Sequence, residues 1–173
     1  VVLLNPNNPV GDVYSEEEAR AVIEKAAACQ AVVVIDEAYH YFYPKTFLPL
    51  LEAYDNVILL RTFSKLCSIA GLRLGVVVSA PGIIGYLWKA RPSFDTNSVA
   101  LLFGERMMDH PELFDRLAAI EREGRQYTRE RLEAEGFCRP LLVCDGTVRQ
   151  MGLAQKVTDL LAQHGAACTL FDE

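Results

Sequence analysis

The chain contains short apolar runs that each end abruptly at polar residues, and this feature constrains its fold most strongly. Val1–Leu4 and Val57–Leu60 are entirely apolar, and Ala31–Ile35 is rich in β-branched residues. Such runs are typical of strands that are buried on both faces of a sheet. Helical patterns separate them. The sequence therefore predicts an α/β protein in which a three-layer arrangement surrounds a mostly parallel sheet.

Helix signals follow the same alternation. Ser15 and Glu18 form a capping box, which predicts a helix from this point to about Ala28. Further helices are expected over residues 47–53, 81–90, 98–109 and 111–135, and a further strand over residues 76–79. After Gly136 a short β-α-β segment is expected, with strands over 141–144 and 167–171 and a helix over 153–164.

Charge and cysteine usage exclude several classes of protein. The net charge is −6, from 17 Lys+Arg against 23 Asp+Glu, and the basic residues are scattered among acids, which argues against a nucleic-acid partner. No apolar run reaches the ~18 residues of a membrane span. The five cysteines form no C-x-x-C pair and complete no zinc pattern with the three histidines, so we expect reduced thiols and a cytoplasmic location. A chain that begins on a strand at Val1, without Met, is expected to be part of a larger protein.

Polar side chains gather where the predicted strands end. One amide, one acid, two hydroxyls, one lysine and one arginine lie at these points: Asn8, Asp36, Thr62, Ser64, Lys65 and Arg73. In open α/β sheets, ligands bind at the carboxyl ends of the strands. Each residue alone also suits a cap, a turn or a solvated surface position. Their order and spacing together favour a binding cleft.

The stretches that carry these residues resemble a known family. Asn5–Gly11, Val34–Tyr39, Arg61–Lys65 and Ala70–Gly75 resemble the large domain of fold-type I pyridoxal-phosphate enzymes, and Pro92–Ser98 adds to the likeness. The match is with the class I/II aminotransferases, and most nearly with their histidinol-phosphate aminotransferase branch. It covers roughly residues 1–137. Val10 departs from it, because the family usually has Thr at this turn position.

The resemblance implies pyridoxal 5'-phosphate as the cofactor and gives four residues roles around its ring. Lys65 would bond to the cofactor aldehyde and then move the substrate α-proton as general base and acid. Asp36 would pair with the protonated pyridine nitrogen and keep the ring an electron sink. Asn8 and Tyr39 would donate hydrogen bonds to the phenolic oxygen of the ring.

The resemblance also implies a phosphate site and an oligomeric state. Thr62, Ser64 and Arg73 would hold the cofactor phosphate, with Arg73 supplying a charge-assisted contact. The partners implied are small-molecule amino-acid and keto substrates, with no nucleic acid and no membrane. Enzymes of this fold type are usually dimers, so a homodimer is expected for the full-length parent.

The tail, residues 138–173, departs from the family and supports two interpretations. Its stretch Leu141–Leu153, with the helix to His164, resembles the N-terminal strand–helix–strand of iron-containing alcohol dehydrogenases. The alternative is a divergent small domain of an aminotransferase. The sequence therefore predicts a partial cofactor-binding large domain over 1–137 and a partial second domain over 138–173, to which no site residue is assigned.

The resulting functional expectation is an aminotransferase fragment. It would exchange an amino group between an amino acid such as glutamate and a 2-oxo or phosphorylated keto acceptor such as imidazole-acetol phosphate. Two alternatives use the same residues, namely a related decarboxylase of the threonine-phosphate type and a truncated remnant without catalysis. A weaker hypothesis is a dehydrogenase dependent on NAD and a metal, whose informative part would lie downstream of residue 173.

Overall fold

A computed structural model describes residues 1–93, 95–136, 140–144, 146–163 and 165–172. It divides the chain into two compact units, Val1–Glu121 and Arg122–Glu173. The predicted boundary between residues 137 and 138 lies outside the described residues, as do Phe94 of the stretch 92–98 and the expected helix end at His164.

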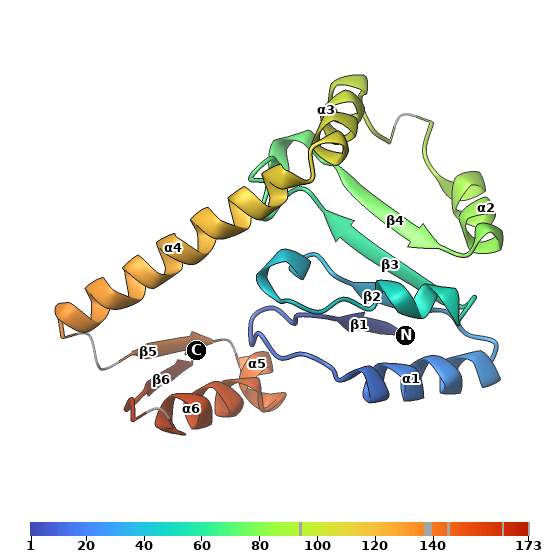
Figure 1. Ribbon diagram of the computed structural model, residues 1–173. Coiled ribbons are helices and arrows are strands. Elements are labelled where there is room, and N and C mark those ends of the chain that lie inside the picture. Colours follow the sequence, from blue (N-terminus) through green and yellow to red (C-terminus); the bar gives the residue numbers. More distant parts are fainter. Residues whose placement is uncertain (94, 137–139, 145, 164, 173) are drawn as a thin grey trace. The chain divides into compact units, whose positions relative to one another are not determined.

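A four-stranded sheet organises the first unit (Figure 1). Its strands are β1 (Val2–Leu4), β2 (Val33–Asp36), β3 (Val57–Thr62) and β4 (Gly75–Ser79), in the order β1-β2-β3-β4. The first three strands are parallel, and β4 pairs antiparallel with β3. The mostly parallel α/β sheet predicted from the apolar runs is therefore confirmed, and the carboxyl ends of β1, β2 and β3 lie at one edge of it.

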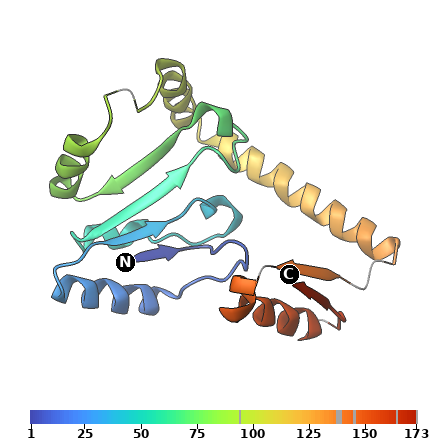
Figure 2. The ribbon, with the colours of Figure 1, turned by 180° about the vertical axis from the view of Figure 1, so that it is seen from behind.

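One face of this sheet packs against α1 (Glu16–Ala28), which lies beside β1 and β2 in both Figure 1 and Figure 2. Leu3, Ile35 and Leu59 are in register across the strands and are buried on this face. Helix α1 begins with the capping box that the sequence predicted, because Ser15 accepts from the Glu18 amide and Glu18 accepts from the Ser15 amide. This core fixes the strands whose ends carry the candidate site.

The helix expected over residues 47–53 forms as a 3₁₀ helix, η2 (Leu48–Glu52). Short connecting helices often take the 3₁₀ form. Two further 3₁₀ turns, η1 (His40–Phe42) and η3 (Ala70–Leu72), follow β2 and precede β4. These turns carry residues next to the candidate site.

The helices after β4 match the sequence predictions closely. They are α2 (Pro81–Ala90), α3 (Ser98–Asp109) and α4 (Glu112–Ala134), which runs from the first unit into the second. A second apolar cluster joins the end of β3 to α3 and to the start of α4; it consists of Phe63, Leu74, Ala100, Met107 and Phe114. The segment that follows β3 is therefore held against a packed core.

The second unit contains a two-stranded parallel sheet, β5 (Leu141–Cys144) and β6 (Thr169–Asp172), with α6 (Leu153–Gln163) between the strands. This is the β-α-β segment expected from the sequence. A short helix, α5 (Gly146–Gln150), was not predicted. Across the described part of the chain, no helix combines the length and apolar character needed to cross a membrane.

Candidate active site

The turn after β1 is fixed by the asparagine at its start. Asn5 is 2% exposed; its amide donates to the Asp36 carbonyl over 2.9 Å, and its side-chain oxygen accepts from the Tyr14 amide over 2.9 Å. The Asn7 amide donates to the Asp12 carbonyl over 2.8 Å. These bonds join the turn to the end of β2, and they leave the side chain of Asn8 exposed at the sheet edge.

Three of the predicted site residues meet at Tyr39. The side-chain amide of Asn8 donates to the Tyr39 hydroxyl oxygen over 3.0 Å. The Nζ atom of Lys65 lies 5.3 Å from the centre of the Tyr39 ring, which is within cation–π range. The segments that follow β1, β2 and β3 thus contribute one residue each to a single cluster. The strand-end pattern gave Asn8 and Lys65, and the family resemblance gave Tyr39.

Asp36 is the last residue of β2 and is half-buried. Its Oδ1 accepts from the Ala38 amide over 2.9 Å, an Asx-type turn that begins the loop carrying Tyr39. Because successive strand residues face opposite sides of a sheet, Asp36 faces away from the side on which Ile35 and Glu37 are buried. Its carboxylate and the buried Glu37 carboxylate therefore do not form an acid pair.

The β3–β4 hairpin positions the proposed phosphate-binding residues. The Thr62 hydroxyl accepts from the Ser64 amide over 3.1 Å and donates to the Leu74 carbonyl over 3.3 Å. Arg73 has a left-handed backbone with φ of 53° and an exposed side chain, which donates to the Ala70 carbonyl over 3.4 Å. Within the described residues, no hydrogen bond joins Arg73 to another predicted site residue. The hairpin therefore links Thr62 to Ser64 directly and to Arg73 only through the backbone.

The buried Glu37, which is 1% exposed, is not among the site residues predicted from the sequence. Its carboxylate accepts two bonds from Arg61, at 2.9 and 3.1 Å, one from the Phe47 amide at 2.6 Å, and one from the Thr46 hydroxyl. The only sequence signal was that a charged residue, Glu37 or Arg61, ends each of two neighbouring apolar runs. Whether these two charges meet depends on the strand register, which the sequence does not specify.

Burial changes the acid–base properties of several side chains in the first unit. Burial, and after it the Arg61 guanidinium, lower the pKa of His40. Burial raises the pKa of the Tyr41 hydroxyl and of the Cys67 thiol. A raised thiol pKa keeps Cys67 protonated at neutral pH, so this cysteine is a poor nucleophile.

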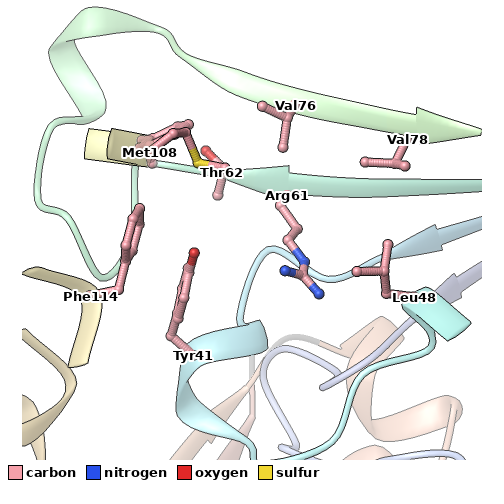
Figure 3. A pocket seen from close by; sticks show the side chains of 9 residues that line it. Tyr41, Leu48, Arg61, Thr62, Val76, Val78, Met108 and Phe114 are labelled. Carbon is pink, nitrogen blue, oxygen red and sulfur yellow. The ribbon is translucent and has the colours of Figure 1, made fainter. Parts of the chain in front are cut away.

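A small apolar pocket of about 190 Å³ lies under the β3–β4 hairpin (Figure 3). Tyr41, Arg61 and Phe114 point into it, and Val76, Val78, Leu48, Phe63 and Met108 complete most of its wall. Of the predicted site residues, Thr62 alone lines it. Its volume is below the ~300 Å³ at which ligand pockets commonly begin. The polar strand-end cluster, rather than this pocket, is the candidate active site.

Comparison with known proteins gives a consistent family. The model of the family "Aminotransferase class I and II" matches residues 1–169. Histidinol-phosphate aminotransferases of Caldanaerobacter subterraneus subsp. tengcongensis and Symbiobacterium thermophilum are 37% identical over 137 residues and 39% identical over 127 residues, which cover 79% and 72% of this chain. These matches span only 38% and 35% of the two relatives, so the chain corresponds to less than two fifths of their length.

Among solved structures, the histidinol-phosphate aminotransferase of Sinorhizobium meliloti in complex with pyridoxal-5'-phosphate has a TM-score of 0.66 and 29% sequence identity to this chain. The similarity covers 79% of this chain and 38% of that structure. The relatives at 37% and 39% identity are aminotransferases, so the threonine-phosphate decarboxylase alternative is not favoured.

Proposed function

Because the chain belongs to the class I and II aminotransferases, we propose that its strand ends form the pyridoxal-phosphate site of a histidinol-phosphate-type aminotransferase. One observation carries the proposal. Asn8, Tyr39 and Lys65, which are far apart in sequence, converge at the carboxyl edge of the sheet, with 3.0 Å from Asn8 to the Tyr39 oxygen and 5.3 Å from Lys65 to the Tyr39 ring. An amine placed beside two hydrogen-bonding groups suits a cofactor that has both an aldehyde and a phenolic oxygen.

The donor set in this cluster fits that cofactor. The Tyr39 oxygen already accepts from Asn8, so its own proton is available to a phenolic oxygen of a ligand. The second N–H of the Asn8 amide can donate there as well. Asp36, at the end of the neighbouring strand, supplies a carboxylate that can accept from a pyridinium N–H. We therefore assign the ring contacts to Asn8, Asp36, Tyr39 and Lys65.

The phosphate would be held by the β3–β4 hairpin. Thr62 is the last residue of β3 and Ser64 lies two residues after it. Arg73 lies two residues before β4, on the segment that returns to the sheet. The guanidinium can form a charge-assisted contact with phosphate oxygens, and the hydroxyls can donate to the remaining ones. Thr62, Ser64 and Arg73 thus anchor the cofactor at the end opposite the ring contacts.

The proposed reaction exchanges an amino group between glutamate and a phosphorylated keto acceptor of the imidazole-acetol phosphate type. Pyridoxal phosphate, when bound, supplies an electron sink for the bonding pair released when the α-proton leaves. Lys65 Nζ would take that proton from the α-carbon of the donor and pass it to the former aldehyde carbon of the cofactor. In the second half of the reaction it would make the reverse transfers and protonate the α-carbon of the keto acceptor. Tyr39 and Asn8 orient the ring, and Asp36 stabilises its protonated nitrogen.

We extend the proposal to the remainder of the protein. Residues 138–173 would form part of a divergent aminotransferase small domain, which is supported by the family match as far as residue 169. A cytoplasmic homodimer would be the working form of the full-length parent. Exposed apolar side chains on α3 support self-association: Val99, Leu101, Leu102 and Met108. Sedimentation of the full-length parent would test the homodimer.

A borohydride-trapping experiment tests the cofactor assignment. The purified chain is incubated with pyridoxal phosphate, reduced, and mapped by mass spectrometry, with Lys89→Ala as the control for an exposed lysine and Lys65→Ala as the test variant. We expect an adduct at Lys65 in the wild type and in Lys89→Ala, and its loss in Lys65→Ala. An adduct at other lysines alone would contradict the assignment.

A half-reaction then separates an active enzyme from a truncated remnant. The loaded chain is mixed with glutamate, and 2-oxoglutarate is measured. Its stoichiometric formation would support the transferase function of this chain. A Lys65 adduct without 2-oxoglutarate would favour a cofactor-binding remnant.

A further inference from the structure

We propose that Glu37 is a positioning residue of the active site, which sets the distance between Tyr39 and Lys65 without touching either of them. The inference rests on the proposed function, because it assumes that Tyr39 and Lys65 act on one cofactor. It goes beyond the assigned site residues, since Glu37 lies on the opposite side of the sheet from Asp36. In the part of the chain that the structure describes, its side-chain hydrogen bonds go to Arg61, Thr46 and Phe47 and to none of those site residues.

The Glu37 carboxylate closes the loop that carries Tyr39. The loop leaves β2 at Glu37 and returns at Phe47, whose amide donates to Glu37 Oε1 over 2.6 Å. The Thr46 hydroxyl lies 2.8 and 2.9 Å from the two carboxylate oxygens. The far end of the loop is thus bonded to the buried side chain of Glu37, the residue ten positions earlier at which the loop begins. The place of Tyr39 between them depends on this closure.

The same carboxylate holds the strand that leads to Lys65. Arg61 donates to Glu37 Oε2 through Nε at 3.1 Å and through Nη2 at 2.9 Å, and its Nη2 also donates to Thr46 over 2.8 Å. Arg61 is the penultimate residue of β3, four residues before Lys65. Figure 3 shows its guanidinium directed away from β3 toward the side of Leu48. One buried ion pair therefore joins the loop of Tyr39 to the strand of Lys65.

The chemistry of the pair makes a sharp test possible. The groups bonded to Glu37 are donors, namely a guanidinium, a hydroxyl and a backbone amide, and the Nδ1 atom of His40 lies 3.8 Å from its Oε2. A glutamine in its place keeps the volume, but it turns one acceptor into an N–H₂ group that faces these donors. The guanidinium then loses its counter-charge inside the protein. Removing the charge of Arg61 as well restores a neutral pair.

The variants are Glu37→Gln, Arg61→Gln and the double variant, with Ile23→Ala as the matched control. Ile23 is fully buried in α1, in the same core cluster as Phe47, and its truncation lowers stability through a cavity without removing a group bonded to Glu37. Pyridoxal-phosphate affinity and the pH dependence of the bound-cofactor absorbance are measured where all variants are folded. We expect about tenfold weaker binding and a shifted absorbance profile in Glu37→Gln, which corresponds to ~1.4 kcal/mol. The double variant should regain part of this loss, and Ile23→Ala should bind as the wild type does.

Equal affinity and an equal absorbance profile in Glu37→Gln and the wild type would overturn the inference. The same would follow if Ile23→Ala lost as much affinity as Glu37→Gln. Should Glu37→Gln fail to fold, Arg61→Lys replaces it, because it keeps the charge opposite Glu37 and loses the two-point contact. A Glu37→Asp single variant keeps the negative charge. If it binds pyridoxal phosphate as tightly as the wild type does, the result would support the charge requirement.

The outcome is distinguishable from failure of the proposed function. If the wild-type chain forms no adduct at Lys65, the cofactor assignment fails, and hydrogen exchange without cofactor decides the inference. Faster exchange confined to residues 38–47 and 62–68 in Glu37→Gln, but not in Ile23→Ala, would support it. A uniform increase along the first unit would overturn it.

Discussion

The side-chain amide of Asn8 donates a hydrogen bond of 3.0 Å to the hydroxyl oxygen of Tyr39, so the turn after β1 and the loop after β2 meet at one atom. That bond uses an acceptor site of the tyrosine and leaves its proton free. Lys65 lies over the ring of the same tyrosine. Tyr39 is therefore the residue at which the segments after three strands meet in the proposed ligand site.

We predict that Tyr39→Phe weakens pyridoxal-phosphate binding about fivefold, since one hydrogen bond contributes about 1 kcal/mol. The ring remains, so the contact with Lys65 should persist and the adduct should still form. Absorbance titration measures the dissociation constant. Tyr86→Phe, at a side chain that is 74% exposed, is the control and should bind as the wild type does. The loss of binding free energy in the double variant Asn8→Ala/Tyr39→Phe should be smaller than the sum of the losses in the two single variants. Unchanged affinity in Tyr39→Phe would remove Tyr39 from the site.

We predict that His40 makes the protein less stable in mild acid. Burial and the Arg61 guanidinium lower the pKa of His40 below its ordinary value of 6.5. As the pH falls below that value, the unfolded chain binds a proton that the folded chain resists, so the free energy of unfolding falls. The contribution of neutral His40 to the free energy of unfolding is therefore complete above about pH 6.5, and it is lost as the pH falls toward the lowered pKa of His40. Urea unfolding of the wild type and of His40→Gln between pH 5 and pH 8 measures the effect. The stability of the wild type relative to the variant should decline toward pH 5, and parallel curves would contradict the prediction.

We predict that Gly75→Ala destabilises the β3–β4 hairpin. A Cβ atom at this position would lie 2.9 Å from the Arg61 carbonyl oxygen, and backbone in a sheet can yield only by disturbing its pairing. We expect a loss of about 1–3 kcal/mol in the free energy of unfolding, the usual range for overpacking. Gly85→Ala, in the interior of α2 with open space around the new methyl group, should instead add about 0.5–1 kcal/mol. Chemical unfolding compares the two, and equal effects would contradict the steric explanation.

The sheet was predictable because its signals are local. The apolar run at β2 and the capping box at α1 each lie within a few residues, and both elements form as expected. The antiparallel direction of β4 and the 3₁₀ form of η2 depend on contacts with the rest of the unit. Such contacts override local propensity, so the sequence pattern alone could not specify them.

The candidate site was only partly predictable, for the same reason. Strand-end position placed Asn8 and Lys65 at one edge of the sheet, but Asn8 and Tyr39 are 31 residues apart and their contact required the folded chain. The Glu37–Arg61 pair spans 24 residues and depends on the β2–β3 register. A one-residue change of register would place these charges on opposite faces of the sheet. The residue types were therefore readable from the sequence, and their pairing was not.

We predict that Ser15→Ala lowers the free energy of unfolding by about 1 kcal/mol, the usual cost of losing a helix N-cap. The Ser15 hydroxyl accepts from the Glu18 amide over 3.1 Å, and without it that amide has no capping partner at the start of α1. Helix α1 supplies the buried Ala19, Ile23 and Ala26 to the core under the sheet, so fraying of its first turn reaches the strands. Ser15→Asp is the control, because aspartate also accepts from the amide and suits the positive end of the helix dipole. Urea unfolding followed by circular dichroism should rank the wild type and Ser15→Asp together, above Ser15→Ala. If Ser15→Asp lost as much stability as Ser15→Ala, the effect would not come from the cap.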